Sequence, residues 1–243
     1  MKQIKIRLKN FIVPLLFCLV ANSLFGQSNA QNDTPIKIGY RVYETVKSKP
    51  NSDVKRVFWL QDTITVGIQH ETIKIDSTYI NRYRRAFKDS TLYRTQEDID
   101  KFIRFVKTSG QNCYSYAFEK YFENNSDFNQ NLFGNSTSID RISAEKILKN
   151  YFIATDEFLT KPAKNLKRII PNNVLLAFVN NKDWSIHLVY YNDKTFYSKN
   201  GAFKPIQFQS LKKFLKKRYW DTVKIRIYKI NDVKVRDVIG GII

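Results

Sequence analysis

The 243-residue sequence contains few cysteines, histidines, glycines and prolines, and these scarcities exclude several classes of protein. Only two cysteines and two histidines occur, and no cluster of them has the spacing of a zinc site. The sequence has neither a glycine-rich phosphate loop nor a Gly-x-Ser-x-Gly nucleophile elbow. With eight glycines, six prolines and 43% hydrophobic residues, the chain is not largely disordered. We therefore expect a folded protein without a metal ion or a cofactor.

The N-terminus has the pattern of a secretory signal peptide. Residues 11–25 form an apolar stretch that is too short for a spanning helix, and Gly26 offers a cleavage point. Cys18 follows the bulky Phe17, which argues against a lipoprotein cleavage site. Four basic residues precede the stretch: Lys2, Lys5, Arg7 and Lys9. We expect residues 1–26 to be a signal peptide and the mature protein to be periplasmic or secreted. An uncleaved membrane anchor is the alternative, and no other segment could cross a membrane.

The net charge of +19 is strongly basic and favours anionic partners. Export makes nucleic acid an unsuitable partner, so we expect none that is specific. The basic residues form two clusters, Arg82, Arg84, Arg85 and Lys88 among Tyr83 and Phe87, and Lys212, Lys213, Lys216, Lys217 and Arg218. In the second cluster, helical spacing places Leu211, Phe214, Leu215 and Tyr219 on one face. Its lysines either solvate the opposite face or bind anionic envelope polymers.

Hydrophobic periodicity divides the chain after residue 26 into two regions. Residues 27–94 form a β-rich extension, with strand alternation at 36–42 and 63–68, a turn at 50–53, and an ambiguous segment at 81–94. Residues 95–243 form the main domain. Its expected helices begin at Thr95, near Asn112 and near Ser143, and its expected strands cover 174–179, 184–191, 195–199 and 223–230. Helices followed by an antiparallel sheet indicate an α+β fold.

Cys113 is the only cysteine left after removal of the signal peptide, so it has no intramolecular disulfide partner. It lies at the expected start of a helix, where free backbone N–H groups and the helix dipole stabilise a thiolate. The pattern favours a nucleophile. A small buried thiol and an intermolecular linker are the alternatives.

A nucleophilic cysteine needs a base, and His187 is the better placed of the two histidines. If Asn192 and Asp193 form a two-residue hairpin loop, Ser198 lies opposite His187. A longer loop would bring Lys199 or Asn200 into that position instead. Ser198 or Asn200 could orient the imidazole, although His187 can also be an ordinary half-buried strand residue.

Residues 112–117, Asn-Cys-Tyr-Ser-Tyr-Ala, followed by His187 at the start of a hairpin, resemble the NlpC-type branch of papain-like cysteine peptidases and amidases. The Ser198-Lys199-Asn200-Gly201 segment also resembles the Ser-Lys-x-Gly segment of some poorly characterised papain-like domains. The resemblance covers about residues 95–230. It implies a papain-like fold and hydrolysis of amide bonds, often those of cell-wall peptides.

The expected function is therefore that of an exported cysteine hydrolase or acyl transferase that acts through a thioester on Cys113. His187 would be the base, and Asn200 or Ser198 would orient it. The backbone N–H of Cys113, with the side chain of Asn112 or Gln111, would form the oxyanion site. The alternative is a non-catalytic papain-fold envelope protein that binds anionic polymers or a protein partner through its basic surface.

Overall fold

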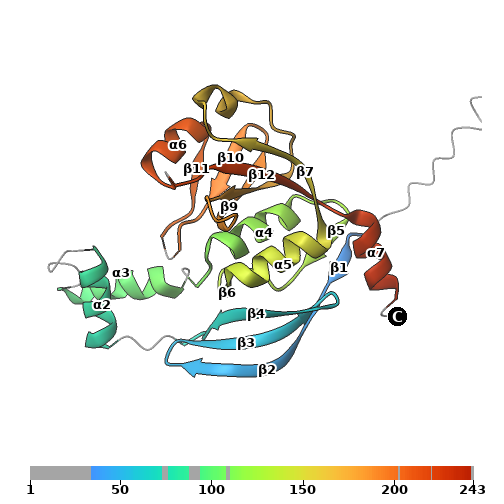
Figure 1. Ribbon diagram of the computed structural model, residues 1–243. Helices are drawn as coiled ribbons and strands as arrows, with labels where there is room; N and C mark the ends of the chain where they lie inside the picture. Colours follow the sequence, from blue (N-terminus) through green and yellow to red (C-terminus); the bar gives the residue numbers. More distant parts are fainter. Residues whose placement is uncertain are drawn as a thin grey trace, which may run out of the picture. The chain divides into compact units, whose positions relative to one another are not determined.

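The computed structural model describes residues 34–72, 76–87, 94–107, 110–201, 203–219 and 221–241 (Figure 1). The expected signal peptide lies outside these residues. The same is true of Lys88 and of the side chains of Arg82, Tyr83 and Phe87 in the first basic cluster. In the part of the chain that the structure describes, no helix has the length and apolarity needed to cross a membrane.

A four-stranded sheet is built mainly from the N-terminal region. Its strands are β2 (Tyr40–Lys49), β3 (Ser52–Trp59), β4 (Asp62–Gln69) and β6 (Thr137–Ile139), in the order β2-β3-β4-β6. β2 is a largely exposed edge strand, and its pairing with β3 shifts register at two points. β1 (Ile36–Ile38) pairs separately, in parallel, with β5 (Phe128–Gln130). The strand character expected for the N-terminal region is confirmed, and β4 joins it to β6 from the later region.

Two helices follow β4 in the chain. They are α2 (Ser77–Phe87), which includes part of the segment that the sequence left ambiguous, and α3 (Gln96–Lys107). The Thr95 hydroxyl accepts a hydrogen bond from the N–H of Asp98 at 3.1 Å, so Thr95 caps α3 as expected. Phe102 of α3 is buried.

A six-stranded antiparallel sheet forms the larger part of the fold. Its order is β11-β10-β9-β8-β12-β7. The strands are β7 (Phe152–Leu159), β8 (Val174–Val179), β9 (Ser185–Asn192), β10 (Thr195–Ser198), β11 (Ile206–Phe208) and β12 (Lys224–Ile230). Every residue of β8 is buried, because both faces of this strand are covered. The helices and the antiparallel sheet give the expected α+β class.

Two helices lie between the two sheets, as Figure 1 shows. α4 (Cys113–Glu123) packs on β8, β9 and β10, and α5 (Arg141–Tyr151) contacts β4 and β7. One side of α4 is an apolar stripe whose five members are all buried: Tyr114, Ala117, Phe118, Tyr121 and Phe122. They belong to a hydrophobic cluster, here called the inner core, that also takes Trp59 from β3, Leu188 from β9 and Val235 from α7 (Asp232–Gly240).

The opposite face of the six-stranded sheet carries a second cluster, here called the outer core. It contains Phe178 of β8 and Val189 of β9, which α6 (Leu211–Lys217) covers with Leu211, Phe214 and Leu215. The 3-10 helix η1 (Ala163–Lys167) packs against α6 and contributes Leu166. The apolar face predicted for residues 211–219 is therefore confirmed. Trp184 is 45% exposed and lies against Arg141 and Lys182.

Candidate functional site

Cys113 is the first residue of α4, as the sequence predicts. Asn112 is the N-cap, and its side-chain oxygen accepts from the Ser115 N–H at 3.2 Å. The Ser115 hydroxyl accepts in return from the Asn112 N–H, which completes a capping box. The Asn112 amide also donates to the Ile139 carbonyl at 2.6 Å. These bonds fix the start of α4 and join it to β6 of the four-stranded sheet.

The surroundings of the Cys113 sulfur contain several groups that favour a thiolate. The backbone N–H groups of Leu188, Tyr114 and Cys113 lie near the sulfur and favour its charged form, and the ammonium of Lys199 acts in the same direction. Cys113 is a free, half-buried cysteine at the edge of the inner core. Burial outweighs these groups and raises the pKa of the thiol to about 11. The helix start predicts a lowered pKa for the Cys113 thiol, but in the structure this pKa is raised.

The hairpin that carries His187 has a different register from the expected one. Asp193 and Lys194, with φ of 44° and 60°, form the two-residue loop, so Tyr197 pairs with Tyr190. The expected loop at Asn192 and Asp193 is wrong by one residue, which displaces the pairing by two. A displacement of two keeps every side chain on its expected face.

His187 points toward the outer core and not toward α4. Its ring stacks on Tyr219 with a centroid distance of 4.0 Å and lies 5.6 Å from the ring of Phe178. Nε2 of His187 is 2.8 Å from the Ser198 hydroxyl oxygen, so Ser198 contacts the imidazole as expected. Nδ1 is buried and has no hydrogen-bond partner among the described residues. Burial, with a smaller contribution from Arg218, lowers the pKa of His187 to about 3.

The expected hydrogen bond between His187 and Cys113 is not formed. Strand alternation explains this result, because Leu188 and Tyr190 face α4 whereas His187 and Val189 face the outer core. Cys113 contacts the first of these clusters. The neutral imidazole is thus held by Ser198 and Tyr219, without a hydrogen bond to the thiol.

The remaining expected site residues have structural partners. The Asn200 side-chain oxygen accepts from the Tyr219 hydroxyl at 3.0 Å and not from His187. The Gln111 side chain is buried and donates to Glu119 at 2.9 Å. The Asn112 amide is used by the cap and by Ile139. The side-chain amides of Asn112 and Gln111, which were expected at the oxyanion site, therefore donate to Ile139 and Glu119 instead.

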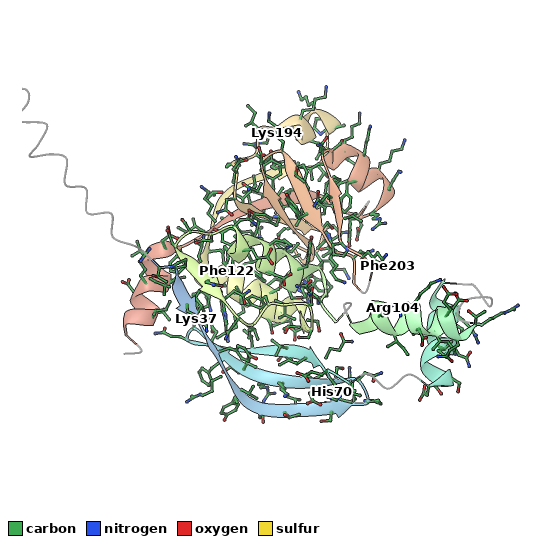
Figure 2. The ribbon with its side chains drawn as sticks, turned by 180° about the vertical axis from the view of Figure 1, so that it is seen from behind. Lys37, His70, Arg104, Phe122, Lys194 and Phe203 are labelled. Carbon is green, nitrogen blue, oxygen red and sulfur yellow. The ribbon has the colours of Figure 1, made fainter. Side chains whose placement is uncertain are left out.

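Lys199 is a buried residue of this site for which the sequence predicts no chemical role. Its side chain is only 2% exposed, and the ammonium donates to the carbonyls of Gly201 at 2.8 Å and Phe203 at 3.0 Å. Burial lowers the pKa of Lys199 to about 8, and the nearby Cys113 opposes this shift. In Figure 2, Lys194 and Phe203 lie toward opposite ends of β10. Alternation after Ser198 would have placed Lys199 on the side of α4.

Tyr219 connects the thiol to the His187 side of the sheet. Burial raises the pKa of its hydroxyl, and the charge of Cys113 raises it further. The same residue stacks on His187 and bonds Asn200. Cys113, Lys199, Tyr219 and Asn200 therefore form one polar cluster, with the His187–Ser198 pair beneath Tyr219.

The described residues contain no group of three His, Cys, Asp or Glu side chains that could hold a metal ion. Comparison with models of protein families, with curated proteins and with solved structures finds no match to this chain.

Proposed function

We propose that this protein is an exported, papain-like thiol hydrolase or acyl transferase that cleaves amide bonds, with Cys113 as the nucleophile. The observation that carries the proposal is the set of groups around the sulfur: three backbone N–H groups and one buried ammonium. The start of a helix alone would be weak support. Here Leu188 comes from β9 and Lys199 follows β10, so the fold gathers the groups from distant parts of the sequence.

The burial of Lys199 supports a chemical role, because a buried ammonium without a carboxylate costs stability. Among the described residues, its hydrogen-bond acceptors are the carbonyls of Gly201 and Phe203, and no acidic side chain pairs with it. Strongly shifted pKa values of this kind gather at functional sites. A lysine with a pKa of about 8 is partly neutral near physiological pH and can then accept a proton.

In the proposed reaction, the Cys113 sulfur attacks the carbonyl carbon of the substrate and its proton passes to the neutral amine of Lys199. The carbon–nitrogen bond then breaks, and the leaving amine takes that proton from Lys199. Water hydrolyses the resulting thioester, which releases the acid and restores the thiol. The backbone N–H groups that face the sulfur lie where they can also stabilise the negative oxygen of the intermediate.

His187 has a positioning role in this proposal. Its ring packs against Tyr219, and Ser198 fixes the ring through Nε2. The base expected from the sequence is thus replaced by Lys199, which lies on the same side of the sheet as the thiol. The resemblance to papain-like enzymes suggests peptides of the cell wall as the substrate class.

Acylation by p-nitrophenyl acetate, a simple acyl donor, tests the assignment without knowledge of the substrate. We expect the folded protein to gain an acetyl group on Cys113, detected by intact mass and peptide mapping, and Cys113→Ser to gain none there. Lys199→Met should slow acetylation at pH 8 by at least about tenfold because the proton acceptor is lost. Lys213→Met is the matched control on an exposed lysine and should react like the wild type.

The same experiment compares the two candidate bases. His187→Asn should slow acetylation less than Lys199→Met if His187 only positions Tyr219. Full acetylation of Lys199→Met with loss of reaction in His187→Asn would return the role of base to His187. Modification of Cys113 only after unfolding would leave it as a structural thiol and would refute the proposed activity.

A further inference from the structure

The outer side of η1 and α6 carries a concentrated positive charge that the proposed chemistry does not use. Six exposed lysines form this surface, here called the basic face: Lys164, Lys167, Lys212, Lys213, Lys216 and Lys217. Among the described residues, none of the six has a carboxylate within ion-pair distance, in contrast to Lys224 and Arg226 of β12, which both pair with Glu157. Unneutralised lysines on one surface produce a positive potential that attracts an anionic partner.

The basic face is rigidly supported from beneath. Leu211, Phe214 and Leu215 turn the apolar side of α6 into the outer core, and Leu166 of η1 packs on the same cluster. Ser210 caps α6 through the Lys213 N–H. Because the apolar side of α6 is used by the core, this helix offers only its lysines to a partner. Figure 1 shows α6 at one end of the six-stranded sheet.

Two aliphatic side chains next to the basic face are exposed without a partner of their own. Ile169, which directly follows Lys167 and Arg168, is 95% exposed, and Leu159 at the end of β7 is 59% exposed. The Asn165 side chain of η1 donates to the Leu159 carbonyl at 3.0 Å, which holds Leu159 beside η1. An exposed isoleucine among lysines adds nothing to the binding of a soluble polyanion. The transfer of its side chain from water into the boundary between lipid headgroups and acyl chains is favourable.

We propose that the basic face, with Ile169 as an inserting side chain, binds the surface of a membrane that contains anionic phospholipids. Lysines suit this partner because each acts as a point charge toward a diffuse layer of phosphates. The exposed part of η1 and α6 has no aromatic side chain on which nucleic-acid bases could stack. This inference does not depend on the proposed activity of Cys113.

Co-sedimentation with lipid vesicles tests the proposal with the full chain. Vesicles of phosphatidylcholine with and without phosphatidylglycerol are compared, and the variants below separate the basic face from the basic and apolar N-terminal stretch, which they leave unchanged. We expect the anionic vesicles to bind more protein. Raising the salt from about 0.05 M to about 0.5 M should remove the difference.

Two variants separate charge from insertion. Changing Lys212, Lys213, Lys216 and Lys217 to Gln should weaken binding to anionic vesicles by about 1,000-fold. The same change at the exposed Lys47, Lys49, Lys149 and Lys229 should have a much smaller effect. Ile169→Ser should weaken binding about threefold to tenfold. Ile142→Ser is its matched control, since Ile142 is also exposed but lies on α5.

Equal binding to neutral and anionic vesicles would overturn the proposal. So would unchanged binding in Ile169→Ser together with release of the protein from vesicles by soluble heparin, which would identify an anionic polymer as the partner. Loss of binding in the four-lysine variant with retained thermal unfolding, and partial loss in Ile169→Ser, is the result that supports a membrane surface.

Discussion

At the scale of single residues, His187 determines how the protein responds to acid. It is fully buried with a neutral ring, and its Nδ1 has no partner to stabilise a proton. The pKa is about 3 in the folded protein and 6.5 in a free side chain. Because the folded pKa is lowered, the unfolded chain binds more protons below pH 6.5. The contribution of His187 to stability is therefore complete above pH 6.5 and decreases as the pH falls toward 3.

We expect the free energy of unfolding to fall by about 2 kcal/mol between about pH 7 and pH 5 because of this histidine. His187→Gln, which keeps a polar group near Ser198, should lose much less over the same interval. Urea unfolding at the two pH values measures both. His70→Gln removes the other histidine, whose side chain is partly exposed, and should retain most of the wild-type decrease. An equal decrease in His187→Gln and the wild type would mean that His187 is not the group that titrates.

The candidate site could be predicted from the sequence only in part. The helix start at Cys113 was predictable, because Asn112 and Ser115 form a local capping pattern. The contact between Ser198 and His187 followed from strand alternation. The missing pair of Cys113 and His187 could not be predicted, since it depends on which face of the sheet α4 covers. Lys199 was missed for the same reason, as its burial depends on α4 and on the loop that contains Gly201.

At the scale of the elements, the β9–β10 hairpin shows why its register was predicted incorrectly. Asp193 and Lys194 both have positive φ, a conformation that favours Asn and Gly and disfavours Lys. The sequence signal therefore pointed to Asn192 and Asp193 as the loop. The Asp193 N–H donates to the Asn172 side chain at 3.1 Å, a tertiary contact that supports the loop from outside the hairpin.

Lys194→Gly should stabilise the protein by about 0.5 to 1 kcal/mol, because glycine adopts this backbone conformation without the steric cost that a Cβ atom adds. Thermal unfolding of the two proteins measures the difference. Lys204→Gly is the control, since Lys204 is also an exposed lysine but has no positive φ. A loss of stability in Lys194→Gly equal to that in Lys204→Gly would show that the turn is not strained.

Most of the helices and central strands were predictable, whereas several edge elements were not. β8 and the buried stripe of α4 have strong hydrophobic patterns. β7 begins at Phe152, directly after α5, with no glycine or proline to mark the change. Six of its eight residues are at least partly exposed, because it is an edge strand that pairs only with β12. Its alternation is therefore too weak to distinguish it from a continuing helix.

At the scale of the whole molecule, Trp59 links the two sheets through the helix layer. It is fully buried on β3, and its ring contacts Phe122 of α4, Tyr151 of α5 and Phe133. Residues 35–243 form one compact unit. The N-terminal strands and the later helices therefore share one core, so we expect them to unfold together.

Trp59→Ala should lower the free energy of unfolding by about 3 to 5 kcal/mol because it leaves a large cavity between β3 and the helices. Trp184→Ala, at a half-exposed position, should cost less than about 1 kcal/mol. Chemical unfolding followed by circular dichroism and by labelling of Cys113 measures both changes. Separate transitions for the two signals would contradict a single cooperative core.

The two register shifts in β2 have a consequence for the behaviour of the protein at high concentration. β2 is ten residues long, lies at the edge of its sheet and exposes Val42, Tyr43 and Val46. A flat edge of this length would offer an unbroken row of free N–H and C=O groups to a strand of another molecule. The shifts between Val42 and Glu44 and between Thr45 and Lys47 bend the strand and interrupt that row. The irregular pairing of β2 thus protects the chain against aggregation through its longest edge.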